Sequence, residues 1–278
     1  MKKFRIMRQK LTNFLLRPVK CNNQEYENKR KIDDPLHLDR FGYKVYSQND
    51  EDGIIQEIFN RIGVTNKTFV EFGVQNGLES NGHYLLFNGW NGLWLEGSKK
   101  HFKKLQKCFK KPLSTKQLTS LNAFITADNI NKLIGENGKI NGEIDLLSID
   151  IDGNDYWIWE KINCINPRVV VIEYNAKFPP PCEWVMEYDP NHIWDGSDKY
   201  GASLKSLELL GKRLGYTLVG TNRNGVNAFF IKEELTKKGL FAEPATAENL
   251  YHARDNGNVY IYSGYAAKEY IGNFYIIP

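Results

Sequence analysis

Five short apolar runs, separated by segments with helical periodicity, constrain the fold of this chain more than any other feature. The runs are KTFVEFG (67–73), GLWLEG (92–97), AFITAD (123–128), IDLLSID (144–150) and RVVVIEY (168–174). Most are continuously apolar rather than alternating, as expected for strands of a parallel sheet that helices cover on both faces. The helices expected between and around them span 50–62, 78–89, 98–111, 128–135, 155–162 and about 203–214. The sequence therefore predicts an α/β fold with five strand–helix units.

Two further strands are predicted at the end of this region. YTLVG (216–220) and VNAFFIK (226–232) are joined by TNRNG, which is too short for a crossover connection. The sheet is therefore expected to have seven strands and to finish with an antiparallel hairpin.

The chain is expected to divide into three parts. Its 278 residues suit one large domain with appendages. We expect a basic arm (1–40), a main domain (41–232) and an aromatic-rich extension (233–278) packed on that domain. The four cysteines include no CxxC pair, which argues against a zinc knuckle or a disulfide framework and favours a reducing compartment.

The basic character of the chain belongs to its arm. Residues 1–31 hold ten Lys/Arg and two Glu, whereas the whole chain has a net charge of +4. The spacing of apolar residues before Pro18 predicts an amphipathic helix, which either extends into solvent, packs, or contacts an anionic membrane surface or partner. No secretory signal and no apolar run of the length of a membrane span is present. A cytoplasmic location is expected, with peripheral contact to the inner face of the membrane through the arm as an open alternative.

The first apolar run leads into a glycine turn, FVEFGVQNG (69–77). Glycine allows a ligand to approach the backbone closely after the first strand of such a sheet. The spacing of Gly73 and Gly77 matches neither the dinucleotide fingerprint GxGxxG nor a Walker loop. A carboxylate at Glu71 suits a cationic amine better than a pyrophosphate, so a nicotinamide-dependent enzyme is the weaker alternative.

Two more acids follow the next predicted strands. Glu96 stands where a carboxylate accepts hydrogen bonds from the two ribose hydroxyls of a nucleoside. Asp128 follows the third predicted strand, where it would accept from an adenine amino group. An amine, a ribose and an adenine without a phosphate describe S-adenosylmethionine (SAM). Each acid alone is more often a helix cap or a surface charge, but three at consecutive strand ends favour this cofactor.

These segments carry a family resemblance. FVEFGVQNG, GLWLEG, ITAD, LLSIDIDGNDYWIW and VVVIEYN, preceded by YSQNDEDGIIQEIF, resemble the class I SAM-dependent methyltransferases, in particular the FkbM-like sugar O-methyltransferases. The resemblance covers roughly residues 41–232. It implies a Rossmann-like class I methyltransferase sheet of seven mostly parallel strands, with a terminal antiparallel hairpin and helices on both faces.

The resemblance also implies the cofactor contacts. The turn after the first strand would line the methionine end, Glu96 the ribose and Asp128 the adenine, while two residues upstream would close over the cofactor. The turn residues are Glu71, Gly73, Gln75, Asn76 and Gly77, and the upstream residues are Ser47 and Gln48. Gln75 departs from the pattern, because many members have glycine there.

Acids after the fourth and fifth strands are the candidates for the chemistry. Methyl transfer to a sugar hydroxyl needs a general base or a divalent cation, and hard oxygen ligands suit Mg²⁺ or Mn²⁺. Resemblance to metal-dependent sugar methyltransferases of the macrocin type implies a metal at Asp150 and Glu173, with Asn175 as a further candidate. Asp152 or His192 would be the base. The alternatives are that the acids cap helices and that His192 is an ordinary loop histidine.

Two other regions carry possible functions. The long segment between Asn175 and Ser203 is expected to be ordered, with Trp184, Trp194 and Tyr200 either stacking on a ligand or packing on the core. Residues 99–116 contain eight lysines and no acid, which indicates a solvated helix face or a site for a phosphate-bearing substrate or anionic lipid. Nucleic acid is not an expected partner, because the domain outside the arm is acidic.

The expected function is SAM-dependent O-methylation of a sugar hydroxyl, on a nucleotide-linked sugar used for capsular or lipopolysaccharide surface polysaccharide. The alternative is a non-catalytic Rossmann-like binding or scaffold module that docks through its basic arm. The sequence indicates neither the identity of the sugar nor the oligomeric state.

Overall fold

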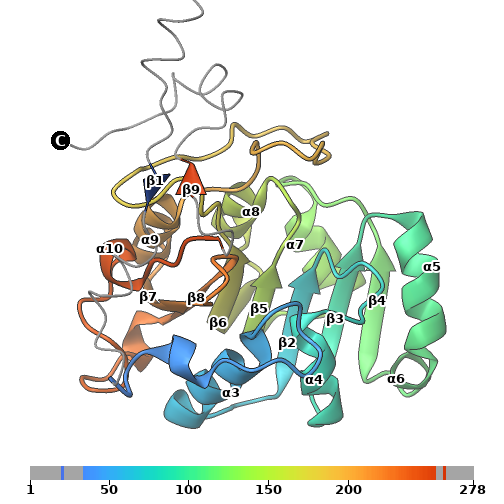
Figure 1. The fold of residues 1–278 in the computed structure, drawn as a ribbon. Coiled ribbons are helices and arrows are strands. Elements are labelled where there is room, and N and C mark those ends of the chain that lie inside the picture. The colour runs from blue at the N-terminus through green and yellow to red at the C-terminus, as the bar shows by residue number, and fades with distance from the viewer. Residues whose placement is uncertain (1–19, 22–33, 255–258, 261–278) are drawn as a thin grey trace, which may run out of the picture.

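A seven-stranded mixed sheet forms the centre of the protein in a computed structural model, which describes residues 20–21, 34–254 and 259–260 (Figure 1). The strand order is β4-β3-β2-β5-β6-β8-β7. The strands are β2 (Thr68–Phe72), β3 (Asn91–Glu96), β4 (Leu118–Asn122), β5 (Gly142–Ile149), β6 (Ile165–Glu173), β7 (Tyr216–Thr221) and β8 (Asn227–Lys232). β2 to β6 pair in parallel, and β8 pairs antiparallel with both β6 and β7. The predicted fold class, with its terminal hairpin, is confirmed.

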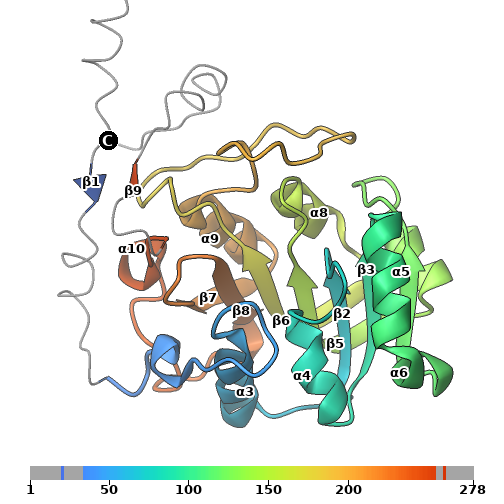
Figure 2. The ribbon, with the colours of Figure 1, turned by 45° about the vertical axis from the view of Figure 1, so that its right-hand side comes forward.

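Helices cover both faces of the sheet, as Figures 1 and 2 show. One face carries α3 (Glu51–Ile62), α4 (Asn81–Phe87), α5 (Lys99–Cys108) and α6 (Lys110–Ser114). The other carries α7 (Ile130–Lys132) with the π-turn η2 (Leu133–Asn137), α8 (Asp155–Lys161), α9 (Leu204–Arg213) and α10 (Ala247–Leu250). Two apolar cores separate the layers, and neighbouring residues such as Phe69 and Val70 of β2 belong to opposite cores. This is why the strand sequences are continuously apolar.

The third strand was predicted in the wrong place. AFITAD (123–128) is not a strand, and the edge strand β4 lies five residues earlier at Leu118–Asn122, with the sequence LTSLN. An edge strand pairs on one side only, and β4 is mostly half-buried, so it does not need a continuous apolar run. Ile125, whose apolar character suggested a strand, instead packs into one core from the loop that follows.

Two predicted helices are also shorter or divided. The helix expected at 78–89 spans only Asn81–Phe87, because residues 74–80 form a turn in front of it. The helix expected at 98–111 divides at Phe109 into α5 and α6. Phe109 leaves the helical region with φ −108° and ψ 32°.

The segments outside the sheet pack against it where the structure describes them. In the long segment before Ser203, Trp184 is fully buried and stacks on Phe178. After β8, the chain returns so that Tyr251 is buried and its hydroxyl donates to the carbonyl of Ala176. The remaining elements are η1 (Leu38–Phe41), η3 (Glu233–Leu235) and a separate pair of short antiparallel strands, β1 (Lys20–Cys21) and β9 (Val259–Tyr260).

The predicted amphipathic helix before Pro18 lies outside the described residues. Within the described part of the chain, no helix has both the length and the apolar character that crossing a membrane requires.

Candidate active site

The glycine turn after β2 is pressed against the end of β5. Gly73 has φ +70°, and its amide donates to the carbonyl of Leu95 at 3.0 Å. A Cβ built on Gly73 would lie 1.6 Å from the carbonyl oxygen of Asp150, so no other residue fits. Gln75, in the same turn, has φ +50°, a conformation that favours glycine. Gln75 therefore adopts a backbone conformation that glycine would adopt without strain.

Glu96 holds this turn from the end of β3. Its Oε2 accepts from the amide of Gln75 at 2.7 Å, and its Oε1 accepts from the amide of Ser98 at 2.6 Å. The side chain is buried but still lines a cleft. Each carboxylate oxygen has two lone pairs, and only one on each is used by these contacts. The remaining lone pairs of the two oxygens are available to accept from the two hydroxyls of a ribose, and this contact stays a prediction.

Replacing Glu96 by Gln should weaken the binding of S-adenosylhomocysteine about tenfold, because a charge-assisted acceptor is lost. The substitution also turns an NH₂ group towards one of the two backbone amides, so the Tm should fall by a few degrees. Calorimetric titration of the folded variant measures the affinity. Glu136→Gln, an exposed acid on η2, is the control. Equal affinities for the wild type and the Glu96 variant would exclude the ribose contact.

Glu71 makes structural contacts as well as lining the first cleft. Its carboxylate accepts from the amides of Asn81 at 2.7 Å and Gly82 at 2.9 Å, at the start of α4, and from Nε1 of Trp94 at 2.8 Å. The side chain lines a cleft, and its bonds to the two backbone amides satisfy donors at the N-terminus of α4. Burial outweighs the three hydrogen bonds and raises the pKa of Glu71 to about 7.

The raised pKa of Glu71 predicts a pH-dependent stability. A carboxyl group whose pKa is higher in the folded than in the unfolded chain binds more protons when folded, so the free energy of unfolding falls as pH rises. The fall should occur between about pH 4.5 and pH 7, and Glu71 should contribute roughly 3 kcal/mol to it. Glu71→Gln should flatten this part of the curve. Urea titrations from pH 4 to pH 8 test this, and parallel curves for the two proteins would contradict it.

Two clefts open at the carboxyl edge of the sheet, and Gly73, Gln75 and Asp150 line both of them. The first, of about 380 Å³, is lined mainly by amide, hydroxyl and carboxyl side chains: Gln48, Asn76, Glu79, Ser80, Asn81, Ser148 and Asn227. The second, of about 330 Å³, adds apolar walls from Phe124, Ile125, Ile151, Ile193 and Trp194 beside Glu96 and His192. Both volumes are in the range of small-molecule sites.

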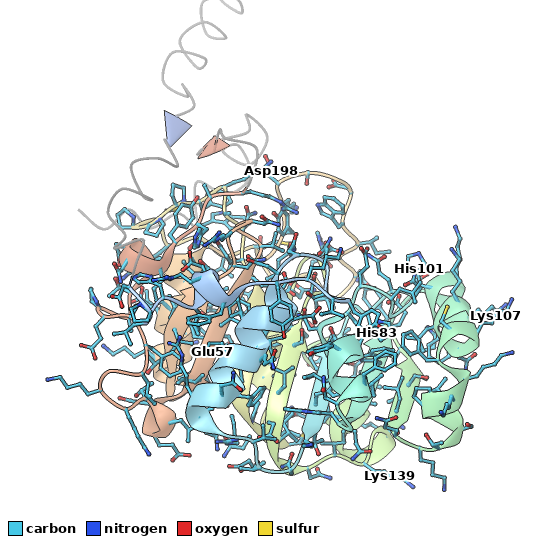
Figure 3. The ribbon with its side chains drawn as sticks, turned by 60° about the horizontal axis from the view of Figure 1, so that its bottom comes forward. Glu57, His83, His101, Lys107, Lys139 and Asp198 are labelled. Carbon is cyan, nitrogen blue, oxygen red and sulfur yellow. The ribbon has the colours of Figure 1, made fainter. Side chains whose placement is uncertain are left out.

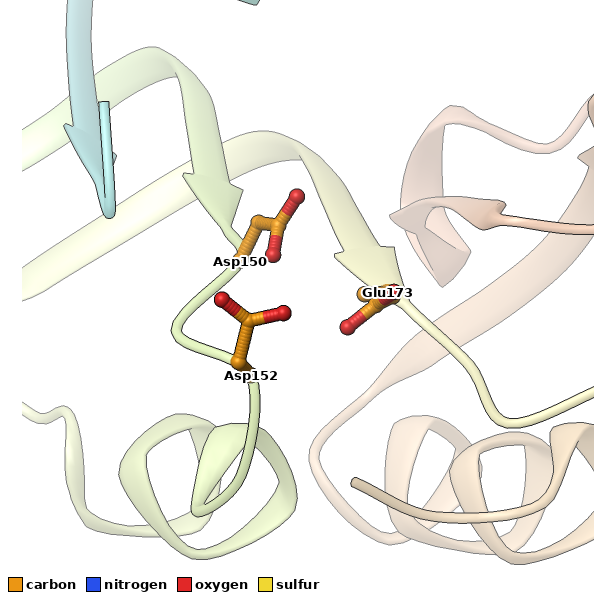
Figure 4. A group of neighbouring side chains, drawn as sticks. All are labelled: Asp150, Asp152 and Glu173. Carbon is orange, nitrogen blue, oxygen red and sulfur yellow. The ribbon is translucent and has the colours of Figure 1, made fainter. Parts of the chain in front are cut away.

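Three acids meet beside the shared part of the clefts (Figure 4). Asp150 and Asp152 follow β5, Glu173 ends β6, and one carboxylate oxygen of each lies within 4.8 Å of the other two. Burial, and then the other acids, hold the pKa of Asp150 and of Glu173 well above the usual range. Burial also raises the pKa of Asp152, while Arg254 and His192 oppose the rise.

A buried acid at the opposite edge of the sheet, Asp145, has the hydrogen-bond donors that Glu173 lacks in the described part of the chain. Asp145, at the start of β5, is fully buried but accepts from Arg168 at 2.8 Å and from three backbone amides, which together lower its pKa. Glu173 has no comparable set of donors, and its buried Oε2 has no hydrogen-bond partner among the described residues. Three hard oxygen donors with an unsatisfied buried carboxylate fit a divalent cation of the Mg²⁺ or Mn²⁺ type.

His192 lies over the loop that carries these acids. Its Nε2 is 3.1 Å from the carbonyl oxygen of Asp152 and must donate to it, so the neutral ring carries its lone pair on Nδ1. The ring fits because Gly153 has no side chain: a Cβ there would lie 2.3 Å from the imidazole. The structure therefore brings the predicted base to the same cleft as Asp150 and Asp152.

Other predicted site residues have structural roles. Asn175 is fully buried and donates to the carbonyls of Asp198 and Tyr200, while its Oδ1 accepts from the amide of Lys177, so it anchors the long loop. Ser47 is also fully buried, and its Oγ accepts from the amide of Asp52 in α3. Neither side chain lines the two clefts described above.

Asp128 is exposed in the turn before α7 and lines neither cleft. Its predicted position at the end of the third strand was wrong because that strand ends at Asn122. The residues that reach the second cleft from this region are Ala123, Phe124 and Ile125. Placing the strand correctly would have identified them.

Of the three aromatic residues proposed to stack on a ligand, only Trp194 lines a cleft. Trp184 is in the core of the long loop, and Tyr200 is buried with its hydroxyl accepting from Arg254. The contribution of Arg254 was missed, since no local pattern connects the C-terminal extension with the acids after β5.

Comparison with known proteins gives similarity at the level of structure. No protein-family model and no curated protein matches the sequence. Among solved structures, a protein assigned as a caffeoyl-CoA O-methyltransferase from Staphylococcus aureus aligns over 69% of this chain and 86% of its own, with 13% identity and a TM-score of 0.46. A SAM-dependent methyltransferase from Clostridium acetobutylicum aligns over 64% and 89%, with 12% identity and a TM-score of 0.40. The N-terminal domain of EvdMO1, crystallised in the presence of S-adenosylhomocysteine and D-fucose, aligns over 81% and 96%, with 10% identity and a TM-score of 0.42.

Proposed function

We propose that this chain is a SAM-dependent O-methyltransferase that acts on a sugar hydroxyl. The observation that carries the proposal is the meeting, at one edge of the sheet, of a glycine turn held by Glu96 and a group of three acids at Asp150, Asp152 and Glu173. The turn and the acids have Asp150 in common, since Gly73 rests on its backbone. The glycine turn, which would hold the methyl donor, therefore lies next to the acids, which could accept the proton of the acceptor hydroxyl.

The second cleft suits the adenosine part of the cofactor. Phe124 and Ile125 offer apolar surface for a purine, and Glu96 offers acceptors for the ribose hydroxyls. When bound, the cofactor supplies an electrophilic methyl group on a sulfonium. The turn from Gly73 to Gln75, which lines both clefts, would orient the methionine end towards Asp150.

The first cleft suits a polyhydroxylated acceptor. The side-chain amides of Gln48, Asn81 and Asn227 carry both donors and acceptors of hydrogen bonds, as a sugar requires. The acceptor oxygen has to lose its proton as it bonds to the methyl carbon. Asp150, which lines both clefts and whose pKa burial raises, is placed to receive it, and Nδ1 of His192 in the second cleft is the alternative.

Asp150, Asp152 and Glu173 are the residues that would hold a divalent cation. Such an ion would lower the pKa of the acceptor hydroxyl and balance the charge of the three acids. The acceptor that we propose, a nucleotide-linked sugar for a surface polysaccharide, follows the family resemblance and the polar lining of the first cleft. The cytoplasmic location that we propose follows the four scattered cysteines, which favour a reducing compartment.

Transfer of a tritiated methyl group from SAM to a panel of nucleotide sugars and free sugars tests the proposal. We expect a labelled product with at least one member, and loss of labelling after chelation that added Mg²⁺ or Mn²⁺ restores. Binding of S-adenosylhomocysteine is measured in parallel. Cofactor binding without transfer to any acceptor would favour the non-catalytic module, and absence of cofactor binding would reject the proposal.

A further inference from the structure

The outer face of α5 and α6 carries charge of one sign. Residues 97–127 hold eight lysines and no acid, and all eight lysines are exposed. None forms an ion pair with a described residue. We call the lysines of α5 and α6 the lysine ridge: Lys99, Lys100, Lys103, Lys104, Lys107, Lys110 and Lys111. Figure 3 shows Lys107 pointing away from the body of the protein on the same helix as His101.

The spacing of these lysines concentrates their charge. At 100° per residue, the five lysines of α5 fall within an arc of about 140°, opposite the buried Leu105. Lys99, Lys103 and Lys107 follow one another at i, i+4, an arrangement that destabilises a helix when the charges are alike. A face that was only solvated would gain from alternating charges, as on α9, where Lys205 pairs with Glu208. The uncompensated repulsion indicates an anionic partner outside the chain.

An exposed apolar group borders the same end of α5. Ile193 is 77% exposed, and Trp194 and Phe124 are each 47% exposed. These three residues line the second cleft together with Ser98 and His101, which lie at the start of α5. The lysine ridge is therefore continuous with a small apolar projection that includes a tryptophan.

We propose that the lysine ridge, with Ile193 and Trp194 at its end, docks the protein on an anionic phospholipid surface. Lysines supply attraction to the headgroup phosphates, and an amphipathic tryptophan with neighbouring apolar side chains inserts at the boundary with the acyl chains. This surface belongs to the folded domain and is separate from the basic arm. It does not depend on the identity of the acceptor.

A lipid surface fits these residues better than nucleic acid does. The ridge contains no arginine, the residue that makes bidentate contacts to phosphate and guanine. The two phenylalanines between its cations offer no open platform for stacking bases, because Phe102 is half-buried and Phe109 is buried. Lysines on a convex helix instead act as point charges towards a broad anionic plane. The residues outside both 1–31 and 97–127 carry a net charge of −12, so an anionic surface attracts the ridge and repels the rest of the folded domain.

Sedimentation of the full chain with vesicles tests the proposal. Vesicles of phosphatidylcholine are compared with vesicles containing about one third phosphatidylglycerol. The triple variant Lys103→Glu, Lys104→Glu, Lys107→Glu is compared with a control that makes the same charge change elsewhere, Lys132→Glu, Lys237→Glu, Lys238→Glu. These control lysines are exposed and form no ion pair with a described residue. The arm is identical in all the proteins, so its contribution cancels.

The wild type and the control should bind the anionic vesicles, with binding that weakens as salt rises. The ridge variant should bind them at least tenfold more weakly, and Trp194→Ala should weaken the part of the binding that survives at high salt. Equal binding of the ridge variant and the control would overturn the proposal and assign any binding to the arm. So would ridge-dependent binding to a single-stranded oligonucleotide without binding to the vesicles.

Discussion

Replacing Gly73 by alanine is expected to unfold or nearly unfold the protein, with a loss of at least about 4 kcal/mol in the free energy of unfolding. Two effects add. An alanine with φ near +70° is strained by about 1 kcal/mol or slightly more. In addition, its Cβ would lie 1.6 Å from the carbonyl oxygen of Asp150, which belongs to the end of a buried strand and has no room to move.

Gly89 provides the control, because it has φ +75° and a Cβ there would meet no atom within 4 Å. Gly89→Ala should therefore lose only the conformational part, about 1 kcal/mol. The free energies of unfolding of the two variants, measured in urea, separate the cost of backbone strain from the cost of the steric overlap with Asp150. If the two substitutions cost the same, the glycine turn does not press on the end of β5, and the shared wall of the two clefts is misplaced.

Replacing Glu173 by glutamine is expected to lower the rate of methyl transfer at least 100-fold while raising the thermal stability of the metal-free protein. The activity falls because the group of acids loses a ligand and a charge. The stability rises because a buried carboxylate with a raised pKa becomes neutral, and its amide can donate to Asp150 and Asp152 nearby.

Thermal unfolding with and without Mn²⁺ tests the role of Glu173 without an acceptor, because it measures metal binding rather than methyl transfer. The ion should raise the Tm of the wild type and leave the Glu173 variant nearly unchanged. Glu187→Gln, an exposed acid on the long loop, should behave as the wild type does. Two results would contradict a cation at this site. The Glu173 variant would be less stable than the wild type without metal, or Mn²⁺ would raise the Tm of both proteins equally.

The sequence placed some predicted site residues correctly and others wrongly. The difference is whether the strand before each residue has a clear apolar pattern. Gly73, Gln75 and Glu96 lie at the carboxyl edge, where the sequence places them, because a turn after a parallel strand faces that edge whatever surrounds it. Asp150 and Glu173 follow the same rule on the neighbouring strands β5 and β6. Asp128 failed because its assignment depended on an edge strand whose sequence, LTSLN, carries a weak apolar signal.

The roles of buried polar side chains were harder to predict than their positions. Glu71 and Ser47 were expected to contact the cofactor, but they hold the starts of α4 and α3. A carboxylate after a strand or a hydroxyl before a helix can contact a cofactor or accept from the amides at a helix start. Which of the two occurs depends on the backbone amides that are left unpaired nearby.

The sequence by itself determined the order of strands and helices, the terminal hairpin and the presence of acids at strand ends, because apolar periodicity and turn residues act over a few neighbouring positions. Only the tertiary structure decided which of those acids are paired. Asp145 and Glu173 stand near opposite ends of adjacent strands, and one finds Arg168 and three amides while the other has a buried oxygen with no partner among the described residues. Those partners come from segments distant in the chain, and the electrostatic energy of a carboxylate depends on every charge and dipole that folding brings within a few ångströms of it.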